Sequence, residues 1–178
     1  MRRQWKGVLL LVWCAVYLPL FGCAVPRLLP QKDLPFSERI GPTGGRVVLV
    51  ASRSSEFKRT LVENLVEAVV SSGMAQKTVG VGDLKEIDPS GYDVIVVIST
   101  CLAWGLDRDV QTFLNRQEKH ANIILVTTSG DGGWLPDRNG RDFDAVASAS
   151  KMNSVDAVVR DVLTRIAARL HNPGPISR

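Results

Sequence analysis

The chain has 178 residues, 45% of them hydrophobic, and carries 22 basic and 18 acidic side chains for a formal charge of +4. Three of the basic residues, Arg2, Arg3 and Lys6, lie in the first 22 positions, which hold no acid, so the rest of the chain is close to neutral. This balance argues against nucleic-acid binding, which needs a strongly basic surface. The residues beyond position 22 suffice for one domain with a substantial hydrophobic core.

The N-terminus has the pattern of an export signal. A basic start precedes an apolar run from Val8 to Phe21, which is shorter than the roughly 20 residues of a membrane-spanning helix but suits a signal peptide. The following Leu20-Phe21-Gly22-Cys23 resembles the lipobox of bacterial lipoproteins, whose cysteine becomes lipidated. We therefore expect residues 1–22 to be a signal peptide and Cys23 to carry a lipid that anchors the chain in a bacterial cell envelope. An uncleaved N-terminal membrane anchor is the alternative.

The cysteines follow the same division of the chain. Cleavage would remove Cys14 and lipidation would occupy Cys23, so Cys101 is left as the single free thiol. Neither an intramolecular disulfide nor a thiolate metal cluster is then expected, and the two histidines lack the spacing of metal ligands. Residues 23–45, rich in Pro and Gly and without apolar periodicity, are predicted to form a tether.

The domain, predicted to span residues 46–172 ahead of a tail at 173–178, alternates strands and helices. Strands are expected where β-branched and other apolar residues run together, at residues 47–50, 78–82, 94–98, 123–126 and 145–147. Helices are expected where apolar residues recur every three or four positions, at residues 57–71, 107–114 and 155–170, and Asp107 is the expected N-cap of the second. Residues 83–92 hold at most one helical turn before Asp88-Pro89-Ser90-Gly91, and residues 127–143 show no helical face.

Such alternation predicts an α/β fold of three layers, a doubly wound parallel sheet with helices on both faces and right-handed crossovers. The second and fourth crossovers, residues 83–92 and 127–143, are expected to be abbreviated. A receiver domain is another small doubly wound fold, but it needs acidic residues after its first strand and an Asp after its third. This chain has Ala51-Ser52 and Ser99-Thr100 at those places, so a receiver domain does not match.

Three loops give residues 47–170 a resemblance to the flavodoxin-like family. They are the hydroxyl-rich segment after the first strand, the segment from Ser99-Thr100 to Trp104-Gly105 after the third, and Thr127 to Trp134 after the fourth. The family's strand order, 2-1-3-4-5, brings these loops together at the carboxyl ends of the strands, where doubly wound folds bind ligands. In flavodoxins the first loop holds the phosphate of FMN, and the other two flank its isoalloxazine ring.

The resemblance implies FMN-binding positions in all three loops, namely Ser52, Arg53, Ser54, Ser55, Thr100, Trp104, Gly105, Thr128, Ser129, Gly130, Asp131 and Trp134. Trp104 and Trp134 are the candidates for stacking on the flavin, and capping the core beneath their loops is the alternative role of each. Glu56 and Phe57 depart from the family's phosphate loop, which has a small polar residue and a hydroxyl there. A carboxylate about 4 Å from a phosphate charge costs about 1 kcal/mol in water and several times more in a shielded loop, unless cations such as Lys58 offset it.

Two functions are consistent with this pattern. One is electron transfer to a redox partner by a membrane-anchored, FMN-binding protein, in which the flavin carries the redox chemistry. The other is a cofactor-free lipoprotein of the same fold that binds a ligand or a protein at the cell envelope. Exported domains fold where FMN is scarce, so a flavin-loaded domain would need a dedicated export route, covalent attachment or scavenging. Cys101 is expected to be buried and unreactive.

Overall fold

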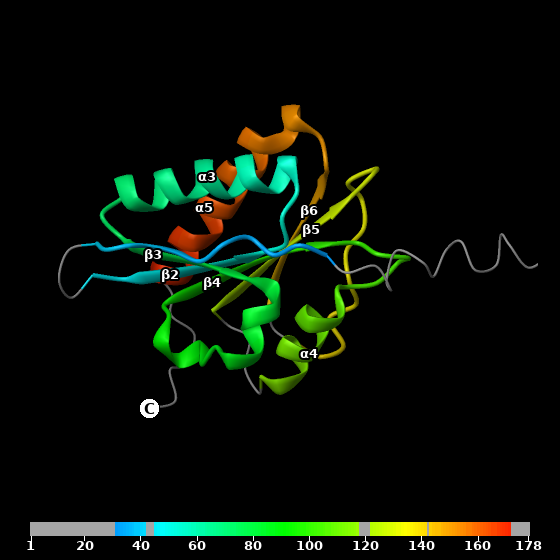
Figure 1. Ribbon diagram of the computed structural model, residues 1–178, viewed down its shortest axis with the longest axis horizontal. Helices are drawn as coiled ribbons and strands as arrows, with labels where there is room; N and C mark the ends of the chain where they lie inside the picture. The colour runs from blue at the N-terminus through cyan, green and yellow to red at the C-terminus, as the bar shows by residue number, and fades with distance from the viewer. Residues whose placement is uncertain (1–30, 42–44, 118–121, 142, 172–178) are drawn as a thin grey trace, which may run out of the picture. The chain divides into compact units, whose positions relative to one another are not determined.

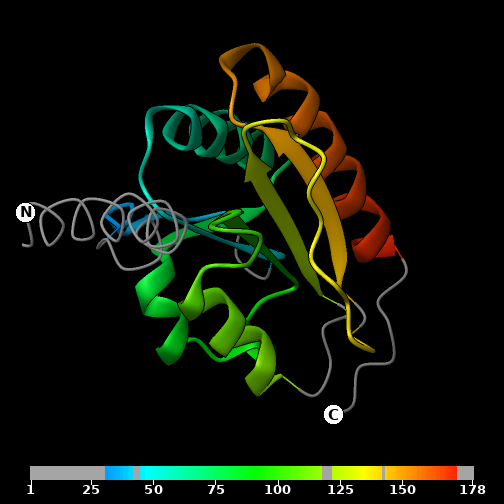
Figure 2. The same ribbon diagram turned by 90° about the vertical axis from the view of Figure 1, so that its right-hand side faces the viewer.

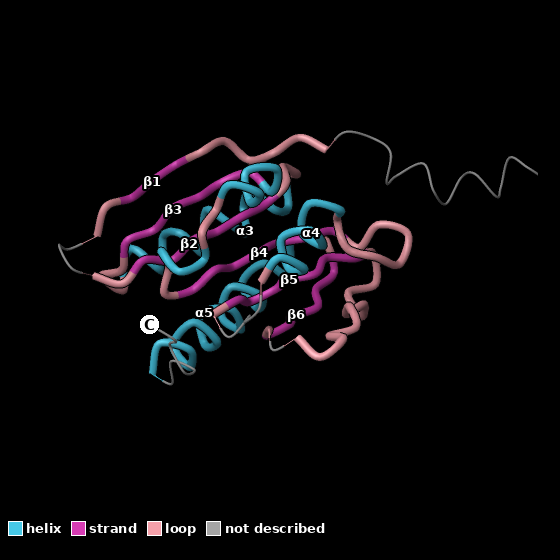
Figure 3. The backbone as a smooth tube through the Cα atoms, turned by 90° about the horizontal axis from the view of Figure 1, so that it is seen from below, coloured by secondary structure: helices cyan, strands magenta, loops and turns pink. Residues whose placement is uncertain are grey.

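A six-stranded sheet organises the computed structural model, which describes residues 31–41, 45–117, 122–141 and 143–171. The strands follow the order β1-β3-β2-β4-β5-β6 across the sheet (Figure 3). Their bounds are β1 Ser37–Arg39, β2 Val47–Ser52, β3 Ala75–Gly80, β4 Val94–Thr100, β5 Ile123–Ser129 and β6 Asp144–Ala149. The α-helices are α3 Glu56–Ser71, α4 Arg108–Arg116 and α5 Val155–His171, and the 3-10 helices are η1 Val81–Glu86, η2 Pro89–Gly91 and η3 Met152–Ser154.

The strands from β2 onward run parallel, and their order in the sheet confirms the predicted order 2-1-3-4-5. β1 is an addition to that pattern, because it pairs antiparallel with β3 at the edge of the sheet. The connection from β3 to β4 contains only η1 and η2, and the described residues between β5 and β6 contain no helix. The described residues of both crossovers that were predicted to be abbreviated therefore contain no α-helix.

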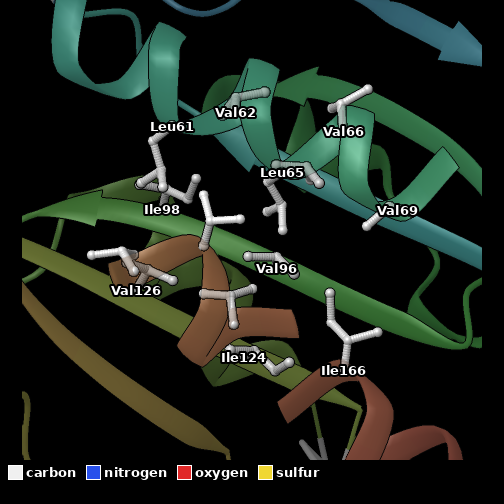
Figure 4. Close-up of a cluster of buried hydrophobic side chains, with 14 of the residues drawn as sticks. Leu61, Val62, Leu65, Val66, Val69, Val96, Ile98, Ile124, Val126 and Ile166 are labelled. Carbon is white, nitrogen blue, oxygen red and sulfur yellow. The ribbon is translucent and has the colours of Figure 1, made fainter. Parts of the chain in front are cut away.

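Both faces of the sheet are covered by helices, so its central strands are apolar on both sides. α3 and α5 lie on one face, and α4 with η1 lies on the other (Figures 1 and 2). In the core between the sheet and the helices α3 and α5, Leu61 and Leu65 of α3 point toward β4, which carries Val96 and Ile98 (Figure 4). Successive side chains of a strand enter opposite cores, which explains the continuous apolar runs that predicted these strands.

Residues 31–41 correct the prediction that residues 23–45 form a tether. Within this segment β1 pairs with β3, and Leu34 is buried in the same core as α3. Ser37, Glu38 and Arg39 are all exposed, so no apolar alternation marked this strand in the sequence. Tertiary pairing with β3 supplies the order that the local sequence does not.

Other predictions fall outside the described residues. The signal peptide at 1–22, Cys23 as a lipid attachment site and the tail at 173–178 all lie there. Among the helices that the structure describes, none combines the length and the hydropathy needed to cross a membrane.

Candidate functional site

The sequence-predicted site residues lie at or after the ends of β2, β4 and β5, which are neighbours in the sheet. These three strands are parallel, so their carboxyl ends share one edge, called here the carboxyl edge. Ser52 to Ser55 lie at the end of β2, Thr100 to Gly105 at the end of β4, and Thr128 to Trp134 at the end of β5. The topology thus brings the three segments to one edge, while FMN binding by these residues stays a prediction.

Arg53, in the middle of the expected phosphate loop, is surrounded by carboxylates. Its Nε and Nη2 donate to the two carboxylate oxygens of Asp107 at 3.0 and 3.2 Å, and its Nη1 donates to both oxygens of Asp33 at 2.9 Å. Nη2 also donates to Asp109. Burial opposes the charge, but the hydrogen bonds to Asp107 and Asp109 and the charges of Asp107 and Asp33 outweigh it and raise the pKa of Arg53 above its ordinary value. All three nitrogens of the guanidinium are hydrogen-bonded to at least one of these three carboxylates.

Asp33 links this cluster to the start of η1. Besides Arg53, its carboxylate accepts hydrogen bonds from the backbone N–H of Val81 at 2.8 Å and of Gly82 at 3.3 Å. A Cβ atom at Gly80 would lie 2.6 Å from the Asp33 side chain, so glycine is needed there for the close approach. The glycines of this segment make room for a carboxylate from a residue far away in the sequence.

The backbone beside Asp33 occupies the end of β2. The N–H of Leu34 donates to the carbonyl oxygen of Ser52 at 3.2 Å, and the N–H of Ser54 donates to the carbonyl oxygen of Lys32 at 2.6 Å. Residues 31–34, called here the strap, therefore pair with the loop in which a phosphate would have to lie. The backbone N–H of Ser54, a donor that this loop could otherwise offer to a phosphate, is already bonded to Lys32 of the strap.

Lys58 is the second cation at this edge, in the first turn of α3. It is only 3% exposed, and its Nζ donates to Oγ1 of Thr100 at the end of β4. Burial is the main cause that lowers the pKa of Lys58 to about 8, with the charge of Asp107 opposing the shift and that of Arg53 adding to it. A buried lysine with a lowered pKa at the ligand-binding edge of such a fold is a recognised mark of a candidate functional site.

Two of the three serine hydroxyls of the expected phosphate loop are bonded within the loop and the helix that follows it. Ser52 is fully buried, and its Oγ donates to the carbonyl oxygen of Arg53 at 2.9 Å. Ser55 is the N-cap of α3, where its Oγ accepts from the N–H of Lys58 at 3.2 Å. Both hydroxyls serve the fold of the loop, so they do not form an open cradle of donors.

The charges at the edge also disfavour an anion. Arg53 and Lys58 supply two positive charges, and Asp33, Asp107 and Asp109 supply three negative ones. Close to such a cluster, a phosphate dianion gains no net attraction and is repelled by every carboxylate. These residues do not fit the phosphate of FMN. They do not form a metal site either, because within the described ranges no three His, Cys, Asp or Glu side chains are grouped as ligands.

Trp104 lies in the loop that joins β4 to α4, between the bridged residues Leu102 and Gly105. The backbone N–H and carbonyl groups of Leu102 and Gly105 bond reciprocally at 2.9 and 3.0 Å, and the two residues between them have positive φ, +45° at Ala103 and +58° at Trp104. This is a two-residue hairpin turn that normally takes Asn and Gly, and each left-handed residue other than Gly costs about 1–2 kcal/mol. The turn nevertheless presents an indole that is 80% exposed.

The loop after β5 is held by its own polar groups. Oγ of Ser129 donates to Asp131 at 2.7 Å and accepts from the N–H of Gly132 at 2.9 Å. The hydrogen bonds that Asp131 accepts from Ser129 and from the N–H of Gly133 hold its pKa below the usual range, the bond from Ser129 contributing most. The carbonyl of Trp134 accepts from Oγ1 of Thr127, so the loop folds back along β5 and Trp134 is half-buried. Asp131 therefore has the turn-forming role, and Gly130 beside it is exposed.

Sequence reasoning missed much of the charged cluster around Arg53. Asp107 was predicted only as the N-cap of α4, which is confirmed by its bond from the N–H of Asp109 at 2.9 Å. Lys58 has a detectable signal, since it precedes Leu61 and Val62 by one helical turn and so shares their apolar face. Asp33 has none, because the contact that gives it a role is with Arg53, distant in sequence. Cys101, expected to be buried, is half-buried and free.

No protein-family model and no curated protein matches this chain. The solved structures to which the chain is similar include the metal-soaked flavodiiron core of Flv1 from Synechocystis sp. PCC6803, with 14% identity and a TM-score of 0.47, and a mutant of the flavo di-iron protein from Thermotoga maritima, with 7% identity and a TM-score of 0.46. The matches cover 75% and 71% of this chain but only 38% and 37% of those chains. The architecture of the chain is that of a flavodoxin-like three-layer α/β fold with an added antiparallel edge strand.

Proposed function

We propose that the chain is a cofactor-free binding module of flavodoxin-like fold, held at the bacterial cell envelope by a lipid on Cys23, and that its carboxyl edge binds a protein partner around Trp104. The observation that carries the proposal is the exposed indole of Trp104 on a strained turn. Backbone strain persists where the surrounding structure maintains it, and it concentrates at functional sites. Tryptophan is also among the residues that contribute most to protein–protein binding.

The chemistry of the partner follows from the surroundings of Trp104. The exposed carboxylates of this edge are Glu56 in the first turn of α3, Asp109 in the first turn of α4 and Asp131 in the loop after β5. Lys58 is buried and the half-buried Arg53 is bonded to three carboxylates, but Lys32 in the strap and Arg108 at the start of α4 are exposed cations. The edge therefore presents both charges, and a complementary partner has an apolar pocket for the indole and polar side chains of both charges around it.

A flavin titration tests the absence of the cofactor. Purified chain at micromolar concentration is mixed with FMN, and flavin fluorescence is followed, with a flavin-free flavodoxin as the positive control. We expect no quenching, because the strap, the serine hydroxyls and the three carboxylates leave the phosphate no favourable position. Saturable quenching at micromolar FMN would overturn the cofactor-free proposal.

A second arm of this test locates the binding surface. A photo-crosslinking amino acid replaces Trp104 in cells, and in a matched control it replaces Arg160, which is exposed on α5. We expect one discrete protein adduct from position 104 that unmodified chain competes away, and none from the control position. Equal adducts at both positions, or none at position 104, would contradict the proposed surface. The substitution should change the free energy of unfolding by less than about 0.5 kcal/mol, because the side chain is exposed.

FMN-dependent electron transfer is the second candidate function, and one observation favours it. The exposed face of Trp104 lies at the same edge as the other predicted flavin positions and is flat and apolar enough for ring stacking. The flavin would supply the redox chemistry, and the chain would supply its position. The fluorescence titration separates the two candidates directly.

The proposed membrane anchor has its own test. Replacing Cys23 by alanine removes the thiol that would receive the lipid, and we expect the chain to move from the membrane pellet to the soluble fraction. Cys101→Ala is the matched control and should leave the chain in the pellet. If Cys23→Ala still sediments with membranes, the N-terminus is an uncleaved anchor and the lipid proposal is wrong.

A further inference from the structure

The outer edge of β1 offers a surface that the carboxyl edge does not involve. β1 pairs with β3 on one side only, and among the described residues no element lies along its other side (Figure 3). In an antiparallel strand, alternate backbone N–H and C=O groups point outward and accept a further strand. Proteins usually protect such edges, but here the flanking Phe36 and Ile40 are 58% and 90% exposed.

The side chains of this segment sort onto two faces. Ser37 and Arg39 line a groove of about 600 Å³ between β1 and α3, whose opposite wall carries Glu63 and Glu67. Successive residues of a strand alternate in direction, so Phe36, Glu38 and Ile40 lie on the face away from the groove. Lys77, which is paired with Glu38 in the sheet, lies over the ring of Phe36 and confirms this face.

We propose that β1 pairs antiparallel with β1 of a second copy of this chain, about a two-fold axis at Glu38, so that one sheet continues across both copies. A two-fold axis perpendicular to the sheet keeps each face continuous, and it therefore allows only registers that pair residues of the same face. Three such registers are centred on β1, at Ser37, Glu38 or Arg39.

The register centred at Glu38 is the self-complementary one. It places Phe36 opposite Ile40 of the second copy, twice, and an aromatic residue opposite a β-branched one is a favourable cross-strand pair. The register centred at Ser37 sets Phe36 against Glu38, and the one centred at Arg39 sets Ile40 against Glu38. Both alternatives place an apolar side chain opposite a carboxylate, whereas the register centred at Glu38 pairs apolar residues with each other.

The two Glu38 carboxylates meet at the axis, where like charges repel each other. Each of them has Lys77 opposite it on β3 of its own copy, and this cation offsets the repulsion. On the other face, Arg39 of the second copy comes to lie beside Ser37, at the groove that Glu63 and Glu67 border. The acidic wall of each groove then faces an arginine from both copies.

The register predicts which cysteine crosslinks to itself. Glu38→Cys is made in the full chain, purified in detergent, with Cys14, Cys23 and Cys101 replaced by alanine. Residues directly opposite in an antiparallel pair lie about 4.5–5.5 Å apart, which suits a disulfide. Phe36→Cys is the matched control, because the two copies of that residue would be about 13 Å apart along the strands. Mild oxidation should give a disulfide dimer from Glu38→Cys at more than about five times the yield of Phe36→Cys.

Two further measurements complete the test. Ile40→Lys, added to Glu38→Cys, should reduce the yield of dimer at least fivefold, because it places a charge against Phe36 of the second copy. Circular dichroism establishes that each variant is folded, as expected for exposed positions. Equal yields at positions 38 and 36 would show random collision and overturn the proposal, as would a dimer that is insensitive to Ile40→Lys or a Glu38→Cys chain that stays monomeric.

Discussion

Replacing Arg53 by alanine is expected to lower the free energy of unfolding at pH 7 by about 3–5 kcal/mol, the usual cost of removing one partner from a buried ion pair. The variant leaves Asp33, Asp107 and Asp109 close together without their cation, and Asp107 is only 5% exposed. It also removes one attachment of the strap, because Asp33 loses its bonds to Arg53, while the backbone bonds of the strap to β2 and its loop remain. Urea unfolding followed by circular dichroism measures the effect.

A control separates this cause from a general loss of charge. Arg108→Ala removes an exposed arginine at the start of α4 and should cost less than about 0.5 kcal/mol. A deficit below about 1 kcal/mol for Arg53→Ala would mean that the carboxylates do not depend on this guanidinium.

Replacing Lys58 by methionine is expected to stabilise the protein at pH 7 by about 1–3 kcal/mol, because an apolar chain of similar length avoids the cost of burying a charge. The pKa of Lys58 is lowered to about 8 in the folded protein. Between about pH 8 and the ordinary lysine value near 10.4, the unfolded chain therefore binds more protons than the folded one. Stability attributable to Lys58 rises with pH across that window, by about 3 kcal/mol in all.

The measurement is the difference in free energy of unfolding between the wild type and Lys58→Met, taken at intervals from pH 7 to 10.5. The advantage of the variant should be largest at pH 7 and should shrink as the pH rises. Lys85→Met, at an exposed position, is the matched control and should show no such dependence. A difference that stays constant with pH would mean that Lys58 titrates as it does in water.

Under the cofactor-free proposal, these two cations explain why a loop that resembles the family's phosphate loop does not bind the family's ligand. The serines after β2 stand where phosphate-binding hydroxyls would be expected, but hydrogen bonds and charges decide what the loop can hold. Arg53 is bonded to three carboxylates, and Lys58 points to Thr100. A cation that is already paired adds little attraction for an anion, because its field is offset by the charges around it.

The sequence by itself determined the central architecture. Apolar runs of β-branched residues fixed the parallel strands, residues spaced by three or four gave the helices, and the gathering of three loops at one edge followed from strand order. These signals are local, since burial on a sheet or a helix face leaves its period in the sequence. The N-cap at Asp107 was also predictable, because it depends on a side chain and a backbone N–H only two residues apart.

Only the tertiary structure decided the strap, the edge strand and the charge cluster. Ser37–Arg39 forms a strand because β3 is available for pairing. Asp33 forms an ion pair with Arg53 because the strap pairs with the end of β2. Arg53 meets Asp33 and Asp107 from positions 20 and 54 residues away. Such contacts follow no sequence period and no fixed spacing, so they cannot be predicted from the local sequence. Whether a serine-rich loop is open to a ligand or covered by its own chain therefore depends on which distant residues the fold brings to it.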